Sequence, residues 1–159
     1  MPSSREIFAR LAEVGFATPP AGKPNGLYDM VTVHNGTAYA SGQLSRLDNE
    51  GNLISGRISA GDSLEEAKRA AAICLLRGLN ALHEKLGDLS RIERFLFVRG
   101  FINADPHFDK HSQVLDQVSQ LIIDLFGKEA GAHSRSALGA GSLPSSGLVE
   151  IEFVVALKN

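Results

Sequence analysis

The sequence predicts an α+β two-layer sandwich, with one mixed sheet of about six strands and two long helices on one of its faces. Two observations lead to this prediction. The expected elements follow the order ββ(β)αβαββ along the chain. Each long helix has a single apolar stripe, and a helix of this kind buries its stripe against one layer. Both helices are therefore expected on the same face of the sheet.

The length and composition fit one domain, residues 1–159. The chain is 43% hydrophobic and 21% charged, and its formal net charge is −2. This charge balance creates no field that would gather nucleic acid or an anionic membrane, so neither partner is expected. The sequence has no signal-peptide pattern or spanning apolar run, and its single cysteine excludes an internal disulfide. We expect a cytoplasmic protein.

Residues 1–25 are expected to pack on this domain as a helix followed by a connector. Apolar residues recur at helical spacing over residues 4–14, with Ser4 as the cap and Gly15 as the stop; they are Ile7, Phe8, Leu11 and Val14. Proline and glycine are concentrated in residues 18–26, which favours an extended connector.

A hairpin is predicted next. Strands at 28–33 and 37–41 flank Asn35-Gly36, a dipeptide that is typical of a tight turn. Residues 52–58 are a weaker candidate for a third strand, because their composition is only partly that of a strand.

The first long helix is predicted over residues 63–86. Ser63 and Glu66 have the spacing of a capping box, and Gly87 ends the helix. Its apolar stripe contains Leu64, Ala67, Ala71, Cys74, Leu75, Gly78, Leu82 and Leu86. Because Cys74 lies on this stripe, we expect it to be a small core residue.

A strand at 95–102 leads to the second long helix. Asp105-Pro106 supplies a cap and a first-turn proline, and Gly127 ends the helix. Its buried face contains Val114, Leu115, Val118, Leu121, Ile122, Leu125 and Phe126.

Two strands, at 134–140 and 148–157, complete the sheet, with residues 139–142 expected as a hairpin loop between them. The sheet face without helices needs a cover, because a wide exposed apolar face is rare in a monomer. Another copy of the chain is the simplest cover, so a homo-oligomer packed sheet to sheet is expected.

Familiar catalytic and metal motifs are missing. The sequence contains no P-loop, no dinucleotide-binding glycine motif and no nucleophilic-serine signature. The five histidines show no metal-ligand pattern, and His107 and His111, four residues apart on a polar helical face, are expected to be solvated. Neither a cofactor nor a metal is expected.

Arg135 is the first candidate for chemistry, because it lies on a predicted strand. Its flat guanidinium can grip a carboxylate through two bonds, which would explain a partly buried arginine, although a solvated surface arginine is the commoner case. Glu150 lies on the polar side of the last strand, and for it too an outward residue that faces solvent beside Glu152 is the commoner case. Tyr28 and Ser41 flank the first hairpin.

These residues also match a family pattern. Residues 134–144, followed by Val149-Glu-Ile-Glu152, resemble the C-terminal signature of the Rid (reactive intermediate deaminase) superfamily, also called the YjgF or L-PSP endoribonuclease family. Tyr28 and the later Ser41-Gly42-Gln43 resemble its N-terminal signature. The likeness covers about residues 26–157 and is greatest to a longer subgroup.

The resemblance implies a chorismate-mutase-like fold in a homotrimer, with ligand clefts between subunits. Deaminating members hydrolyse small enamines or imines of 2-oxo acids and release ammonia, without cofactor or metal. Carried over, Arg135 would clamp the substrate carboxylate and Glu150 would orient or activate the water. Tyr28 would line the cleft, and Ser41 with Gly42 would contact the substrate.

Three positions depart from that pattern or extend it. Ala137 stands where the best-known deaminases have cysteine, so a thiol is lost while a backbone contact can remain. An asparagine of the deaminases falls at Ser112, and Asn103 is a possible substitute for it. All three are carried forward as substrate-binding candidates.

Three functions remain open at this point. The first is hydrolysis of enamines or imines, and the second is binding or sensing of a small carboxylate without turnover. The third, RNA cleavage, has the least support, because the chain has no basic stripe, no tryptophan and only 6% aromatic residues to stack on bases.

Overall fold

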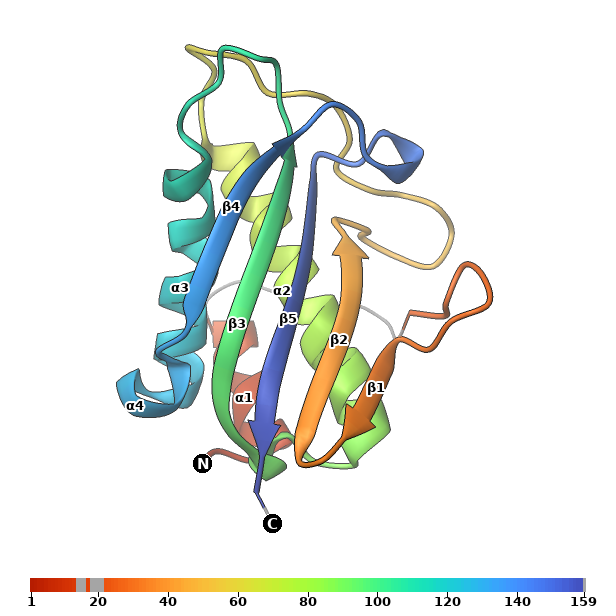
Figure 1. Ribbon diagram of the computed structural model, residues 1–159, viewed down its shortest axis with the longest axis vertical. Helices are drawn as coiled ribbons and strands as arrows, with labels where there is room; N and C mark the ends of the chain where they lie inside the picture. Colours follow the sequence, from red (N-terminus) through yellow and green to blue (C-terminus); the bar gives the residue numbers. More distant parts are fainter. Residues whose placement is uncertain (14–16, 18–21, 159) are drawn as a thin grey trace.

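The computed structural model describes residues 1–13, 17 and 22–158, in which five strands form one sheet (Figure 1). The strands are β1 Val31–His34, β2 Thr37–Leu44, β3 Ile92–Asn103, β4 Ser134–Ala140 and β5 Val149–Leu157. The α-helices are α1 Ser4–Glu13, α2 Glu65–Leu86, α3 His111–Phe126 and α4 Lys128–Gly131, and two short 3-10 helices are η1 Leu89–Arg91 and η2 Pro144–Ser146. The predicted helix end at Val14 and Gly15, and residues 18–21 of the predicted connector, lie outside the described residues.

The sheet has the order β1-β2-β5-β3-β4 and is mixed. β3 and β4 are parallel, whereas the other neighbouring pairs are antiparallel. Helices α2 and α3 both lie behind the sheet in Figure 1. The predicted two-layer arrangement, with both long helices on one face, is therefore confirmed.

Residues 52–58 do not form the sixth strand. Leu53, Ser55 and Ile58 each make one isolated bridge, to Arg46, Gly147 and Ala104 respectively. Three bridges to three different segments cannot build a continuous ladder, so this stretch is a connection along the end of the sheet.

The predicted hairpin between the last two strands is also wrong. β4 pairs in parallel with one edge of β3, and β5 pairs with the other edge. The chain between them therefore passes across the end of β3, and Gly139 belongs to β4 itself. The cause is α3, because a helix between β3 and β4 returns the chain to the start of β3 and makes the pair parallel.

Both long helices begin later than predicted. The cap of α2 is Leu64, and the Ser63 hydroxyl accepts a weak bond from the Glu65 N–H at 3.4 Å instead of forming a capping box. Asp105 closes a local turn, in which its carboxylate accepts from the His107 N–H at 2.9 Å. An aspartate carboxylate accepts hydrogen bonds from nearby backbone N–H groups both in turns and at helix N-termini. For this reason the sequence predicted a helix cap at Asp105, where the structure has a turn.

The core lies between the helices and the sheet. At Gly78 of α2 a Cβ would overlap the ring of Phe153, and at Gly100 of β3 it would overlap Leu115, so both glycines allow close packing of helix on sheet. Cys74 is fully buried and its thiol donates to the Val149 carbonyl at 3.3 Å. This confirms the expectation of a core cysteine.

Apolar side chains are exposed on the strands as well. Tyr39 of β2 is 51% exposed and Leu138 of β4 is 44% exposed, and each alternates with residues that face the helices. Their cover by a second copy stays a prediction. Among the described helices, none combines the length and apolar character needed to cross a membrane.

Candidate functional site

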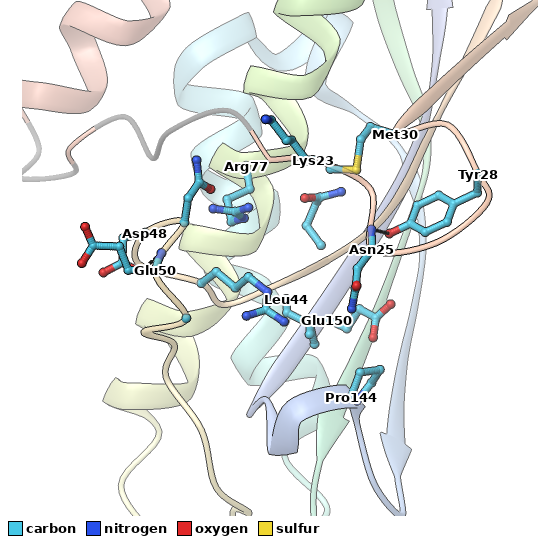
Figure 2. A pocket seen from close by; sticks show the side chains of 15 residues that line it. Lys23, Asn25, Tyr28, Met30, Leu44, Asp48, Glu50, Arg77, Pro144 and Glu150 are labelled. Carbon is cyan, nitrogen blue, oxygen red and sulfur yellow. Dashed lines mark hydrogen bonds between the residues drawn. The ribbon is translucent and has the colours of Figure 1, made fainter.

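A cavity of about 700 Å³ opens beside β2, where the sheet loses its regular edge (Figure 2). β1 pairs with residues 37–40 of β2, and the β2–β5 register shifts between Ala40 and Gln43. Beyond the bulge, β2 continues to pair with β5 in a shifted register, while its ladder with β1 covers only Thr37 to Ala40. The lining residues are Lys23, Asn25, Tyr28, Met30, Gly42, Gln43, Leu44, Arg46, Asp48, Asn49, Glu50, Gly51, Arg77, Pro144 and Glu150.

Glu150 enters this cavity from β5. Its neighbours Val149 and Ile151 are buried towards the helices, so the alternation of the strand turns Glu150 to the opposite face. A Cβ at Gly42 would overlap the Glu150 carboxylate, so the missing side chain at position 42 makes room for it. Gly42 and Glu150, both expected from the sequence to belong to the site, are thus brought together.

The environment of Glu150 favours its protonated form. Burial raises the pKa of this carboxyl above its usual value, and the nearby charge of Glu152 adds to the effect. Arg99 is paired with Glu152, to whose Oε1 its Nη1 donates at 2.5 Å. A carboxyl group with a raised pKa is a stronger base, once ionised, than an ordinary glutamate and is therefore better suited to take a proton from water.

Tyr28 and Ser41 lie at the same end of the sheet. Tyr28 lines the cavity from the segment before β1, and its hydroxyl accepts from the Asn25 N–H at 3.3 Å. The prediction that Tyr28 begins a strand was wrong, because β1 starts at Val31. Ser41 adjoins Gly42, and its N–H donates to the Met30 carbonyl at 3.0 Å.

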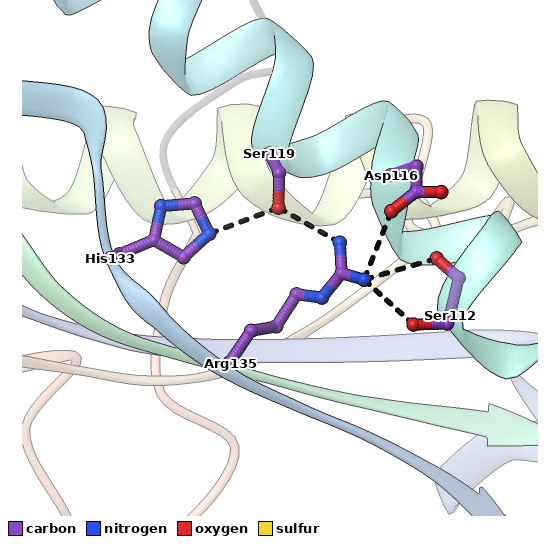
Figure 3. Close-up of polar contacts among 5 residues, drawn as sticks. All are labelled: Ser112, Asp116, Ser119, His133 and Arg135. Carbon is purple, nitrogen blue, oxygen red and sulfur yellow. Dashed lines mark hydrogen bonds and ion pairs between the residues drawn. The ribbon is translucent and has the colours of Figure 1, made fainter. Parts of the chain in front are cut away.

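Arg135 belongs to a separate polar cluster between β4 and α3 (Figure 3). Its Nη2 donates to Ser112 Oγ at 2.8 Å and forms an ion pair with Asp116 Oδ1 at 3.0 Å. Its Nη1 donates to Ser119 Oγ at 2.9 Å. The side chain is 19% exposed, so Arg135 is not the solvated surface arginine that composition alone favours.

His133 extends this cluster and defines its hydrogen bonds. His133 Nδ1 lies 2.6 Å from the Gly131 carbonyl, and because a carbonyl can only accept, the proton is assigned to Nδ1. In the neutral ring, Nε2 then accepts from the Ser119 hydroxyl at 3.0 Å. Ser119 therefore accepts from Arg135 and donates to His133, which fixes the guanidinium on α3.

Ser112 was predicted from the sequence as a site residue, whereas Asp116, Ser119 and His133 were not. The available signal was the spacing of residues 112, 116 and 119, which places three polar side chains on one face of α3. This polar face of α3 indicates a binding site for Arg135 only when β4 is known to lie beside it.

The last two predicted substrate-binding residues, Ala137 and Asn103, lie in different surroundings. Ala137 lies on β4 two residues after Arg135, so both side chains point to the same side of the strand. Asn103 is buried elsewhere, where its Oδ1 accepts from Arg57 Nε and its Nδ2 donates to the Gly147 carbonyl, both at 3.3 Å. Asn103 thus holds the β3 end to neighbouring loops, and its amide is committed there.

Arg135 and Glu150 do not meet within one chain. β3 lies between β4 and β5, and Arg135 pairs with the helix-facing Val98 while Glu150 lies on the other face. The cavity contains the predicted residues Tyr28, Gly42 and Glu150, and the α3 cluster contains Arg135 and Ser112. Within the described ranges, no three His, Cys, Asp or Glu side chains converge as metal ligands.

Comparison with known proteins adds a family. The family model described as "YjgF/chorismate mutase-like, putative endoribonuclease" matches residues 8–157. Protein TCP17 of Trypanosoma cruzi is 32% identical over 157 residues, which cover 99% of this chain and 98% of that protein.

Two solved structures have a closely similar fold. Atu1372, a protein of unknown function from Agrobacterium tumefaciens, gives a TM-score of 0.84 at 32% identity and covers 98% of this chain and 96% of that one. A "putative endoribonuclease" of Shewanella oneidensis MR-1 gives 0.85 at 26% identity and covers 95% of this chain and 99% of that one.

Proposed function

This chain belongs to the YjgF/chorismate mutase-like family, and on that premise we propose that it hydrolyses small enamines or imines of 2-oxo acids. The products are the oxo acid and ammonia, and no cofactor takes part. The observation that carries the proposal is Glu150, a carboxyl group with a raised pKa that lines a cavity together with Gly42 and Tyr28.

The site we propose is shared between two copies of the chain. Arg135 and Glu150 are separated by β3 and lie on opposite faces of the sheet, so one copy cannot hold both against a small substrate. A second copy placed beside edge strand β4 brings its cavity to Arg135 of the first. A closed ring of three copies would repeat this contact three times and complete three clefts.

In this site Glu150 acts on water. The unprotonated carboxylate takes a proton from a water molecule whose oxygen attacks the imine carbon and forms the C–O bond. As this bond forms, the C=N π pair moves to nitrogen, which takes the proton from Glu150 and becomes an amino group. The new hydroxyl group then passes its own proton to this nitrogen by way of Glu150 while the C=O double bond forms. The C–N bond breaks with its electron pair on nitrogen, and ammonia leaves. General acid–base help of this kind is typically worth about 10² to 10⁴ in rate, which is enough for a substrate that already reacts with water.

Arg135 supplies selectivity. Its guanidinium is held in position by hydrogen bonds to Ser112 and Ser119. In the free protein Asp116 occupies the position that a substrate carboxylate would take. The side chain of Asp116 is 67% exposed, and exchanging an exposed ion pair costs about 1 kcal/mol or less. A fixed positive charge at this position favours imines that carry a carboxylate over neutral ones.

The test is release of ammonia and pyruvate from freshly generated 2-aminoacrylate. The purified protein should accelerate release over buffer, and Arg135→Ala and Glu150→Gln should each remove most of that acceleration. A wild-type rate equal to that of buffer would reject the proposal.

Binding without turnover is the second candidate, and Ala137 favours it, because the side chain at this position brings no reactive group. A sensor of small carboxylates would gain thermal stability from pyruvate through Arg135 and would still not release ammonia. RNA cleavage is tested separately with single-stranded RNA, and Arg135→Ala serves as the contamination control.

A further inference from the structure

Arg77 is a buried cation that neither the sequence motifs nor the proposed reaction uses. It lies on α2, and the residue is 5% exposed. Its Nη1 atom is buried and has no hydrogen-bond partner in the described part of the chain. Arg77 is one of the residues that line the cavity beside β2, and Figure 2 shows its side chain extending from α2 among them.

Burying the Arg77 guanidinium without a partner lowers the stability of the fold. A guanidinium stays charged at neutral pH even where burial lowers its pKa, as it does for Arg77. A buried charge without a partner destabilises the fold, and an apolar side chain of similar volume would avoid that cost. An anion that enters the cavity and accepts hydrogen bonds from the unpaired N–H groups of Arg77 would offset this loss of stability.

The guanidinium is also held in place. A Cβ built on Gly22 would lie 2.8 Å from Arg77 Nη2, so the chain at residue 22 packs directly against it. The backbone at Gly22 and helix α2 therefore hold the Arg77 guanidinium in an orientation that faces the cavity. A restricted donor loses little conformational entropy when it binds a ligand.

The charges around the cavity select among anions. Lys23 and Arg46 add positive charge to that of Arg77, whereas three carboxylates, Asp48, Glu50 and Glu150, oppose it. Asp48 is already saturated, since it accepts from the Glu50 N–H at 2.9 Å, the Asn52 N–H at 3.1 Å and the Asn52 amide at 2.5 Å. The three positive and three negative side chains balance, so the cavity has no excess of positive charge that would gather a dianion such as phosphate. A singly charged carboxylate needs only the Arg77 guanidinium to bind it.

We propose that the cavity beside β2 binds a small carboxylic acid through Arg77, at a site formed by a single chain and separate from the Arg135 cluster. The ligand shares this cavity with Glu150, the residue of the proposed hydrolysis, but its binding requires neither Arg135 nor a second copy of the chain. Its volume of about 700 Å³ leaves room for a ligand larger than pyruvate that extends from Arg77 towards Glu150.

The test compares thermal unfolding in pyruvate, phosphate and chloride at equal ionic strength for the wild type and three variants. Arg77→Met removes the anchor, Arg69→Met changes an exposed arginine of the same helix, and Arg135→Met removes the other candidate clamp. Pyruvate should raise the Tm of the wild type, Arg69→Met and Arg135→Met by a few degrees. Arg77→Met should gain less than the wild type, because only Arg135 remains to bind pyruvate, and in chloride alone it should be at least as stable as the wild type.

Two outcomes would overturn the inference. Pyruvate stabilisation that persists in Arg77→Met and disappears in Arg135→Met would assign all binding to Arg135 and leave the proposed function intact. Stabilisation by phosphate without any by pyruvate would reject a carboxylate site. If Arg77→Met does not fold, wild-type crystals soaked in pyruvate decide, because the inference requires its carboxylate at Arg77 Nη1.

Discussion

Glu150 and Gly42 occupy adjacent strands so closely that the carboxylate of Glu150 fills the space of a side chain at position 42. The bulge in β2 between Ala40 and Gln43 brings the glycine to this position. The placement of the Glu150 carboxyl group, whose pKa is raised, therefore depends on a residue that has no functional group of its own.

Gly42→Ala is expected to displace Glu150 and reduce the rate of imine hydrolysis by about 10² or more, the range that a positioned general base supplies. The fold should survive, because the far end of the glutamate side chain can rotate away. Steady-state ammonia release and thermal unfolding measure the two effects. Gly141→Ala is the matched control, since a Cβ there meets no heavy atom within 4 Å among the described residues.

The pH dependence of the rate should reflect the raised pKa of Glu150. Because the unprotonated carboxylate is the base, the rate rises with pH through the pKa of Glu150, which lies above the ordinary glutamate value of 4.5. Glu152→Gln removes the neighbouring negative charge and should move this rise to lower pH with little change in the plateau. Glu93→Gln, an exposed carboxyl on β3, should leave the profile unchanged. An unmoved profile in Glu152→Gln would contradict the assignment.

Asp116→Asn tests whether the ion pair of Arg135 competes with substrate. The exposed Asp116 contributes about 1 kcal/mol or less to stability, so the midpoint of urea unfolding should change little. The KM for an imine carboxylate should fall, because Nη2 of Arg135 is released. Asp124→Asn, which removes a carboxylate bonded to Gln120 on the same helix, should leave KM unchanged. A raised KM in Asp116→Asn would mean that Asp116 positions the guanidinium.

Cys74 should be unreactive in the folded protein. Burial and the charge of Glu150 raise the pKa of its thiol well above the ordinary value, so the reactive thiolate is scarce. A disulfide reagent should label one thiol per chain in denaturant and react far more slowly without it. Fast labelling of the native protein would show that α2 opens readily from the sheet.

The sequence predicted the elements that carry a strong period. The apolar stripe of α2 is compatible only with a helix, and the alternation of β5 only with a strand. Both long helices, each with a single apolar stripe, pack on one face of the sheet as expected. Strand order was not predictable in the same way, because the pattern of β4 is the same whether it pairs in parallel with β3 or forms a hairpin with β5. The start of α3 was misplaced because Asp105 suits a turn and a helix cap equally.

The site was predicted to a smaller extent. Arg135 and Glu150 were found through the family resemblance, but no local pattern indicates that β3 separates them within one chain. Arg77 left no signal, because one charged residue on a long helix is ordinarily solvated. Its burial depends on the residues of other segments that pack over it, including Gly22.

Mixing Arg135→Ala with Glu150→Gln tests the shared site most directly. The two inactive variants are unfolded together in equal amounts, refolded and assayed for ammonia release. In a random ring, each cleft draws Arg135 from one copy and Glu150 from the next, so about one quarter of the clefts regain both groups. The account predicts recovery of about one quarter of wild-type activity, whereas a mixture as inactive as either variant alone would contradict it.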